Sequence, residues 1–178
     1  MLVTRYKTEI FNYLFRFLGD HAAADDVFQE TFVQVHLALQ QFDRTRKFRP
    51  WLFTIASHKA RDYLRAQARQ HTVSQSTLTT AKTADSQGSV IDLMASDMAD
   101  PAKQVEAHDT HELVRAVVQS MPDHLRNPLI LAYFHQYPYK QIAEILDVPV
   151  GTVKSRVHAA VAHFAVLWKK PESESNRS

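Results

Sequence analysis

The side chains best suited to chemistry near the carboxyl end of the chain lie in residues 150–158. They are hydroxyl, cationic and imidazole groups, which form hydrogen bonds with phosphate oxygens and with the edges of bases. They are Thr152, Lys154, Ser155, Arg156 and His158. At 3.6 residues per turn, Ser155 and His158 fall on one face of a helix. This face favours contact with nucleic acid, and the alternative is the solvated edge of an ordinary helical hairpin.

Two short helices are expected to position these side chains. Before them, Ile142, Ala143 and Leu146 form one apolar stripe, and a break at 147–149 follows because proline cannot continue a helix. A second helix is predicted from about Val150, with apolar residues at helical spacing opposite the polar face. These apolar residues are Val153, Val157, Ala160, Val161, Phe164, Leu167 and Trp168. The arrangement is that of a helix-turn-helix.

A second set of cations lies in the first half of the chain. The loop 43–50 carries Arg44, Arg46, Lys47 and Arg49 around Phe48, a mixture that suits phosphate contact and base stacking. A helix is predicted from about Pro50 to about Arg69, and one polar, mostly basic stripe runs along it. The stripe consists of Lys47, Thr54, His58, Arg61 and Arg65. A solvated loop and a buried helix with a solvated edge are the alternatives.

A different kind of face is expected on the helix predicted from about residue 20 to about Phe42. Its apolar stripe is Phe28, Phe32, Val35, Leu39 and Phe42. About half a turn away, two acids and two aliphatic residues fall together, namely Asp26, Glu30, Val33 and Leu37. An apolar centre with a charged rim is typical of a protein-binding surface; incidental surface apolarity is the alternative.

The remaining segments also predict helices, so the chain is expected to have an all-α fold. A helix is predicted over 5–18, ended by Gly19 and Asp20. Periodicity then vanishes from His71 to about Pro101, which indicates a linker rich in small polar residues. Helices return at about 103–119 and from Pro122 to about His135, and Pro128 should kink the second of these or shift its start.

Composition excludes several classes of protein. Only 3 glycines and no cysteine are present, so phosphate-binding glycine loops, disulfides and thiolate chemistry have no residues to use. His108, His111 and Glu112 are too few for a recognisable metal site, and no nucleophile stands beside a base. We therefore expect no catalytic residue, metal or cofactor. With no apolar run of membrane-spanning length, a cytoplasmic protein without membrane insertion is expected.

Several strings resemble those of a known family. Residues 25–33 (DDVFQETFV), 51–56 (WLFTIA) and 62–65 (DYLR) resemble region 2 of the extracytoplasmic-function (ECF) sigma factors of bacterial RNA polymerase, within the sigma-70 family. Met121 and Pro122 with Arg126, then 142–146 (IAEIL) and 149–156 (PVGTVKSR), are similar to region 4. The resemblance covers nearly the whole chain.

The resemblance implies two small helical domains joined by a flexible linker. Region 2 would span 1–70, an acidic linker 71–102, region 4 103–170 and a tail 171–178. It also implies a promoter-specificity subunit that binds core RNA polymerase through the beta-prime clamp and beta flap, recognises two promoter elements, helps to melt DNA, and is held inactive by an anti-sigma factor. A free-standing helix-turn-helix regulator is the alternative, but such a protein needs neither the acidic face nor the first basic stripe.

Each candidate residue receives a role from this resemblance. The polymerase-binding residues would be Asp26, Gln29, Glu30, Val33 and Leu37. The residues contacting the minus-10 element would be Arg44, Arg46, Lys47, Phe48, Arg49, Trp51, Thr54, His58, Arg61 and Arg65. Those contacting the minus-35 element would be Lys140, Val150, Gly151, Thr152, Lys154, Ser155, Arg156 and His158. The chain departs from the family at His58, where Asn is usual, at Ala159, where Arg is frequent, and at Asp147, where Gly is frequent.

Overall fold

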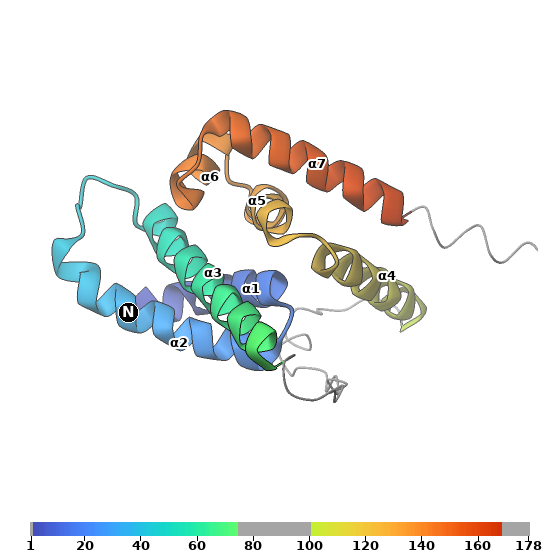
Figure 1. Cartoon of the computed structure of the whole chain (residues 1–178), viewed down its shortest axis with the longest axis horizontal. Helices are drawn as coiled ribbons and strands as arrows, with labels where there is room; N and C mark the ends of the chain where they lie inside the picture. Colours follow the sequence, from blue (N-terminus) through green and yellow to red (C-terminus); the bar gives the residue numbers. More distant parts are fainter. Residues whose placement is uncertain (1, 75–100, 169–178) are drawn as a thin grey trace, which may run out of the picture.

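The computed structural model describes residues 2–74 and 101–168, and within these ranges every regular element is a helix. The first half of the chain contains α1 (Leu2–Leu18), α2 (His21–Ala38), the 3-10 helix η1 (Leu39–Gln41) and α3 (Phe48–Ser74). The second half contains α4 (Pro101–Gln119), α5 (Asp123–Tyr133), α6 (Tyr139–Leu146) and α7 (Val150–Trp168). Figure 1 shows α3 beside α2, and both α1 and α3 contact helices of the second half. The all-α prediction is confirmed.

The break between α1 and α2 follows its sequence signals. Gly19 has a φ of 80°, a left-handed conformation that ends α1. Asp20 then caps α2, since its side chain accepts a hydrogen bond of 2.7 Å from the backbone nitrogen of Ala23.

The buried face of α2 is rotated from the predicted one. The residues that it buries are Ala23, Ala24, Val27, Thr31 and Val35. Phe28 and Phe32 are only partly buried, and Leu39 is exposed. Because α2 ends at Ala38 and continues as a 3-10 turn, whose period is 3.0 residues, a stripe extrapolated at 3.6 loses its phase there.

Helix α3 is longer than predicted at both ends. It begins at Phe48, so that Pro50 lies in its first turn, where a missing N–H removes no helical hydrogen bond. It ends at Ser74, which makes the first residues of the predicted linker helical. Most of that linker, 75–100, and the predicted tail lie outside the described residues.

Helix α5 accommodates a proline in its interior. It begins at Asp123 and ends at Tyr133, two residues before the predicted end, with Pro128 within it. The chain then turns through Gln136, which has a φ of 54°, and enters α6 after Pro138.

The helix-turn-helix forms as predicted. Asp147 is left-handed, with φ 53° and ψ 56°, and the backbone nitrogen of Val148 donates to the carbonyl of Ala143 at 3.1 Å. Aspartate tolerates this conformation better than most non-glycine residues, so it can replace a turn glycine.

The buried face of α7 is narrower than predicted. Val153, Val157 and Ala160 are buried, whereas Val161 is 41% exposed and Trp168 is exposed as well. Helices α4, α5 and α6 all lie on one side of α7 (Figure 1). One-sided cover buries a single stripe, and Val161 lies about 100° around the helix from Ala160.

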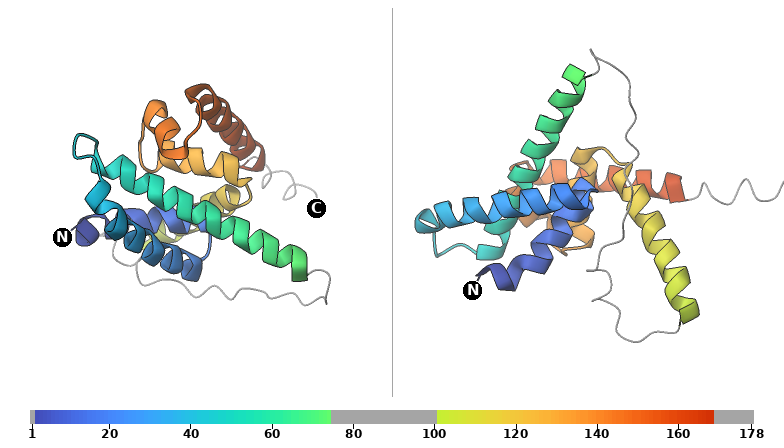
Figure 2. Two further views of the ribbon diagram at one scale, coloured as in Figure 1. Left: turned by 60° about the vertical axis from the view of Figure 1, so that its left-hand side comes forward. Right: turned by 90° about the horizontal axis from the view of Figure 1, so that it is seen from below.

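The two halves of the chain pack against each other, which the sequence did not predict. Helix α3 contacts α6, and α1 contacts both α4 and α5 (Figure 2). A buried hydrogen-bonded chain crosses this contact: the Tyr13 hydroxyl donates to Asn127 Oδ1 at 2.9 Å, and Asn127 Nδ2 donates to Ser57 Oγ at 3.1 Å. The apolar residues of both halves therefore share one core.

Candidate nucleic-acid and partner interfaces

The acid-and-aliphatic face of α2 lies open to solvent. Asp26, Gln29 and Glu30 are exposed, and Val33 and Leu37 expose 61% and 66% of their surfaces. Glu30 Oε2 lies 3.5 Å from Lys59 Nζ on α3. Large aliphatic side chains this exposed, in the middle of a charged rim, have the composition of a protein-binding surface. The structure thus keeps all five predicted residues together on one available face.

The polar face at the start of α7 is also open. The residues that the structure leaves exposed there and at the start of α6 are Lys140, Val150, Gly151, Lys154, Ser155 and His158. Thr152 and Arg156 are partly buried, and Ser155 Oγ donates to the carbonyl of Thr152 at 3.0 Å. A Cβ built on Gly151 would meet no atom within 4 Å, so the backbone there is open to close approach. This face has the shape and chemistry of a helix that enters the DNA major groove.

The basic loop before α3 is held by its aspartate. Asp43 Oδ1 accepts hydrogen bonds from the backbone nitrogen of Thr45 at 2.9 Å and from its hydroxyl at 2.7 Å. These bonds hold the pKa of Asp43 below its usual value. Arg44, Arg46 and Lys47 are exposed around this turn, where they are available to phosphates.

The two aromatic residues of the predicted minus-10 set belong to an aromatic cluster. Phe48 and Trp51 are partly buried, and their ring centroids lie 5.4 Å apart. Phe42 packs on both, at 5.6 Å from Phe48 and 4.6 Å from Trp51, and Tyr6 lies 5.5 Å from Phe48. This packing fixes the start of α3 against α1 and the end of the α2 segment.

Arg49 has protein partners in this structure. Its Nε donates to Glu9 Oε1 at 2.7 Å, and Nη2 pairs with the same carboxylate and donates to the carbonyl of His135 at 3.3 Å. The guanidinium also lies over the Tyr137 ring, 4.4 Å from its centroid. The Arg49 side chain, which was predicted to contact DNA, is therefore bound by protein groups at the junction of the two halves. Glu9 and His135 are 40 and 86 residues away in sequence, so local patterns could not reveal this.

The residues of the predicted polar stripe that lie on α3, here called the α3 stripe, are Thr54, His58, Arg61 and Arg65. The last three face the second half across a cleft. Thr54 Oγ1 donates to the carbonyl of Pro50 at 3.0 Å, inside its own helix. Further along, the cleft has a volume of about 330 Å³ and lies between α3 and the helix-turn-helix. Its lining includes His58, Arg61, Asp62 and Arg65 on one side and Asp147, Val148 and Arg156 on the other. Residues predicted to contact the minus-10 element therefore meet Arg156, predicted to contact the minus-35 element, in one cleft.

The electrostatics of this cleft are mixed. Desolvation and the nearby Arg61 lower the pKa of His58, against the opposite effect of Asp62 and Asp147. Arg65 Nη1 lies 3.7 Å from Asp62 Oδ1. The imidazole of His58 is consequently neutral at neutral pH, where it can both donate and accept a hydrogen bond.

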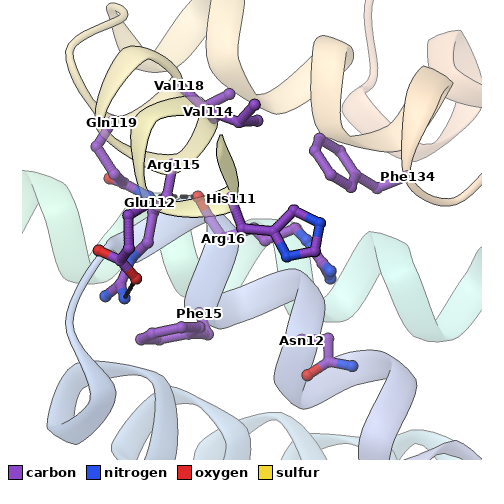
Figure 3. A pocket seen from close by; sticks show the side chains of 10 residues that line it. All are labelled: Asn12, Phe15, Arg16, His111, Glu112, Val114, Arg115, Val118, Gln119 and Phe134. Atoms are coloured by element: carbon purple, nitrogen blue, oxygen red, sulfur yellow. Dashed lines mark hydrogen bonds and ion pairs between the residues drawn. The ribbon is translucent and has the colours of Figure 1, made fainter. Parts of the chain in front are cut away.

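A second groove lies between α1 and the second half. It has a volume of about 240 Å³, and Figure 3 shows Phe15 and Asn12 on α1 opposite His111 and Phe134. Gln119 Nε2 donates to the carbonyl of Arg16 at 2.5 Å along its edge. No group of three metal-ligating side chains occurs within the described residues; His108, of the predicted weak pair, has no described side chain.

Sequence reasoning missed the polar residues that join the halves. Tyr13, Asn127 and His135 are buried, and Glu9 pairs with Arg49. The available signal was a polar residue within an otherwise apolar helical stripe, as with Tyr13 between Ile10 and Leu14. That signal marks a buried hydrogen bond without identifying its partner.

Comparison with known protein families shows which family this chain belongs to. The family model for sigma-70 region 2 matches residues 2–70, and that for sigma-70 region 4 matches residues 111–164. The chain belongs to the sigma-70 family, whose members are transcription initiation factors rather than enzymes.

Its relatives define the branch of that family. The chain is 32% identical to RNA polymerase sigma-H factor of Pseudomonas aeruginosa, over 90% of this chain and 80% of the relative. It is 31% identical to ECF RNA polymerase sigma-E factor of Escherichia coli, over 90% and 81%, and 29% identical to ECF RNA polymerase sigma factor SigW of Bacillus subtilis, over 88% and 81%. The protein is thus an ECF sigma factor, a promoter-specificity subunit, and the stand-alone regulator is not favoured.

Solved structures show the same fold. The sigma factor RpoE of Bartonella quintana, in complex with the anti-sigma factor NepR, matches with a TM-score of 0.70 at 19% identity over 95% of each chain. CnrH in complex with the cytosolic domain of CnrY matches with a TM-score of 0.62 at 23% identity, over 94% of this chain and 84% of that one. No helix within the described residues has the length and apolarity needed to span a membrane.

Proposed function

We propose that this sigma factor divides its work among three surfaces. The α2 face binds core RNA polymerase at the beta-prime clamp, the loop 43–47 with the α3 stripe contacts the minus-10 element, and the polar face of α7 enters the major groove of the minus-35 element. The open α7 face carries this proposal best, because hydroxyl and cationic side chains project there from a helix that begins directly after the Asp147 turn.

The domain boundaries belong to the same proposal. The first functional unit is 1–70, the linker is 71–102, the second unit is 103–170 and the tail is 171–178. The second unit also contacts the beta flap of the polymerase. The chain carries out no catalysis of its own and uses the active site of the polymerase.

An anti-sigma factor is the proposed inhibitory partner. One solved relative in fold, RpoE, is a complex with the anti-sigma factor NepR, and another, CnrH, is a complex with the cytosolic domain of CnrY. The exposed Val33 and Leu37 would give such a partner an apolar anchor, so it would compete with polymerase for α2.

Transcription in vitro tests the function as a whole. Purified chain, core RNA polymerase and a pool of genomic promoter fragments should yield transcripts that core polymerase alone does not produce. Transcripts that are the same with and without the chain would contradict the proposal.

The polymerase surface has its own test in Val33→Asp. A buried, unpaired carboxylate at the apolar centre should weaken retention of core polymerase by at least about tenfold. Val166→Asp is the matched control, since Val166 on α7 is 68% exposed and lies outside all three surfaces. Equal retention of polymerase by the two variants in a pull-down would reject the α2 assignment.

A further inference from the structure

The contacts between the two halves converge on Arg49. From α3, its guanidinium pairs with Glu9 of α1, donates to the carbonyl of His135, and lies over the ring of Tyr137. The last two residues belong to the segment between α5 and α6, in the second half. One side chain therefore ties α1 and α3 to the second half.

His135 fills the space beside this arginine. Its side chain is 6% exposed, and its ring centroid lies 4.9 Å from that of Phe53 and 5.7 Å from that of Tyr13. Nδ1 is 3.6 Å from Glu9 Oε1, while Nε2 is buried without a hydrogen-bond partner. An uncharged imidazole fits this aromatic site, and a protonated one would place an unsatisfied N–H in it.

In this structure the two halves pack against each other, an arrangement here called closed. The closed arrangement covers part of the surface that is proposed to contact DNA. His58 and Arg61 face Asp147 and Arg156 across the cleft of about 330 Å³. A cleft of this volume is in the range of a small-molecule site. A cleft of about 330 Å³ is too small to admit a DNA duplex. Full access of the minus-10 element to the α3 stripe consequently requires the halves to separate.

We propose that Glu9, Arg49 and His135 form a clasp that holds α3 against the second half and keeps the α3 stripe from DNA until the halves separate. This inference rests on the proposed function, because it concerns regulation of the proposed minus-10 surface. When the clasp opens, Arg49 is released beside Arg46 and Lys47 and joins the basic loop. The same arginine is then a clasp residue in one state and a phosphate ligand in the other.

Protonation of His135 opposes the clasp. Burial lowers the pKa of His135 to about 4, the Arg16 and Arg49 charges act in the same direction, and Glu9 opposes them. In the separated state the imidazole returns toward its ordinary pKa of 6.5. Closure therefore has its full stability above pH 6.5 and loses it progressively as the pH falls toward 4.

Distance measurement within the full chain tests the clasp. The sequence has no cysteine, so Gln34→Cys on α2 and Ala162→Cys on α7, both exposed positions, provide the only two sites for a donor and an acceptor dye. Glu9→Gln keeps the size of the side chain and removes its charge, and should raise the open-to-closed ratio by about tenfold, seen as lower energy transfer. Asp25→Asn, which removes one charge from the His21–Asp25 pair within α2, should leave the transfer unchanged.

The second part of the test measures energy transfer as a function of pH in the parent chain and in His135→Phe. Energy transfer in the parent chain should fall between pH 7.5 and 5, while His135→Phe, which cannot be protonated and suits the aromatic site, should keep its transfer over that range. Unchanged far-ultraviolet circular dichroism separates opening from unfolding. Low transfer in the parent chain at pH 7.5, equal transfer in Glu9→Gln and Asp25→Asn, or the same acid response in His135→Phe would each overturn the clasp.

Transcription separates the two proposals. With core polymerase and limiting sigma factor, Glu9→Gln should give about threefold more transcript than the parent chain, because less free energy is needed to separate its halves. If chains that differ in energy transfer give equal amounts of transcript, the closed arrangement does not keep the α3 stripe from DNA, and the clasp proposal is overturned. Failure of the parent chain to direct any transcription would overturn the proposed function itself, whatever the dye measurements show.

Discussion

The polar face of α7 and the stripe on α3 are both candidates for promoter contact, but they are built differently. The α7 face depends on one turn and one helix, and most of its side chains are exposed. The α3 stripe follows an aromatic cluster and the Arg49 junction at the start of the helix, and it ends in a cleft against the second half. The α7 face is exposed to solvent in the folded chain, whereas the exposure of the α3 stripe depends on the position of the second half.

This difference accords with the tasks proposed for the two surfaces. Reading a major groove requires a rigid helix whose side chains are already presented. The α3 stripe is proposed to contact the minus-10 element, whose DNA melts only once polymerase and promoter are in place. A stripe covered by the second half cannot bind nucleic acid prematurely, whereas an exposed α7 face needs no such control.

The largest expected effect tests whether the α3 region depends on packing between the halves. Asn127→Ala removes the bridge between Tyr13 and Ser57 and leaves both hydroxyls buried without this partner. We expect the free energy of unfolding to fall by about 2 kcal/mol, measured by urea denaturation. Ser155→Ala on α7 is the control, since its hydroxyl is exposed and bonds within its own helix, and it should change stability by less than about 0.5 kcal/mol.

A similar loss in both variants would remove the contrast between the surfaces. It would mean that the polar groups of α7 stabilise the fold as strongly as the buried bridge does.

The same contrast explains what could be predicted from the sequence. The helix-turn-helix was predictable because proline, helical periodicity and the Asp147 turn act within a few residues. The acid-and-aliphatic face of α2 was likewise visible as helical spacing. The partners of Arg49 were not, since charge near an aromatic residue in a loop gives no indication that Glu9 and His135 come together from distant segments.

The second expected effect concerns the α7 surface. Arg156→Ala should weaken promoter binding by about tenfold at moderate salt and lower the slope of log affinity against log salt by about 0.9, the value for one lost phosphate contact. Fluorescence anisotropy of a labelled promoter over a salt series measures both quantities. Lys7→Ala removes an exposed cation from α1 and should change neither.

An unchanged slope with weaker binding would give Arg156 a role in the cleft rather than on phosphate. The α7 surface would then share the dependence on the other half that distinguishes the α3 stripe.

The smallest expected effect tests whether the α3 stripe acts after binding. His58→Ala should reduce promoter opening about threefold while initial binding changes by less than about twofold, because the cleft opens to His58 only when the halves separate. Permanganate reactivity of the melted thymines measures opening, and gel shift measures binding. His58→Asn, which restores a side chain that donates and accepts hydrogen bonds, should recover most of the opening.

If His58→Ala weakens binding as much as opening, the stripe already contacts duplex DNA in the first complex. The two surfaces would then act together rather than in sequence.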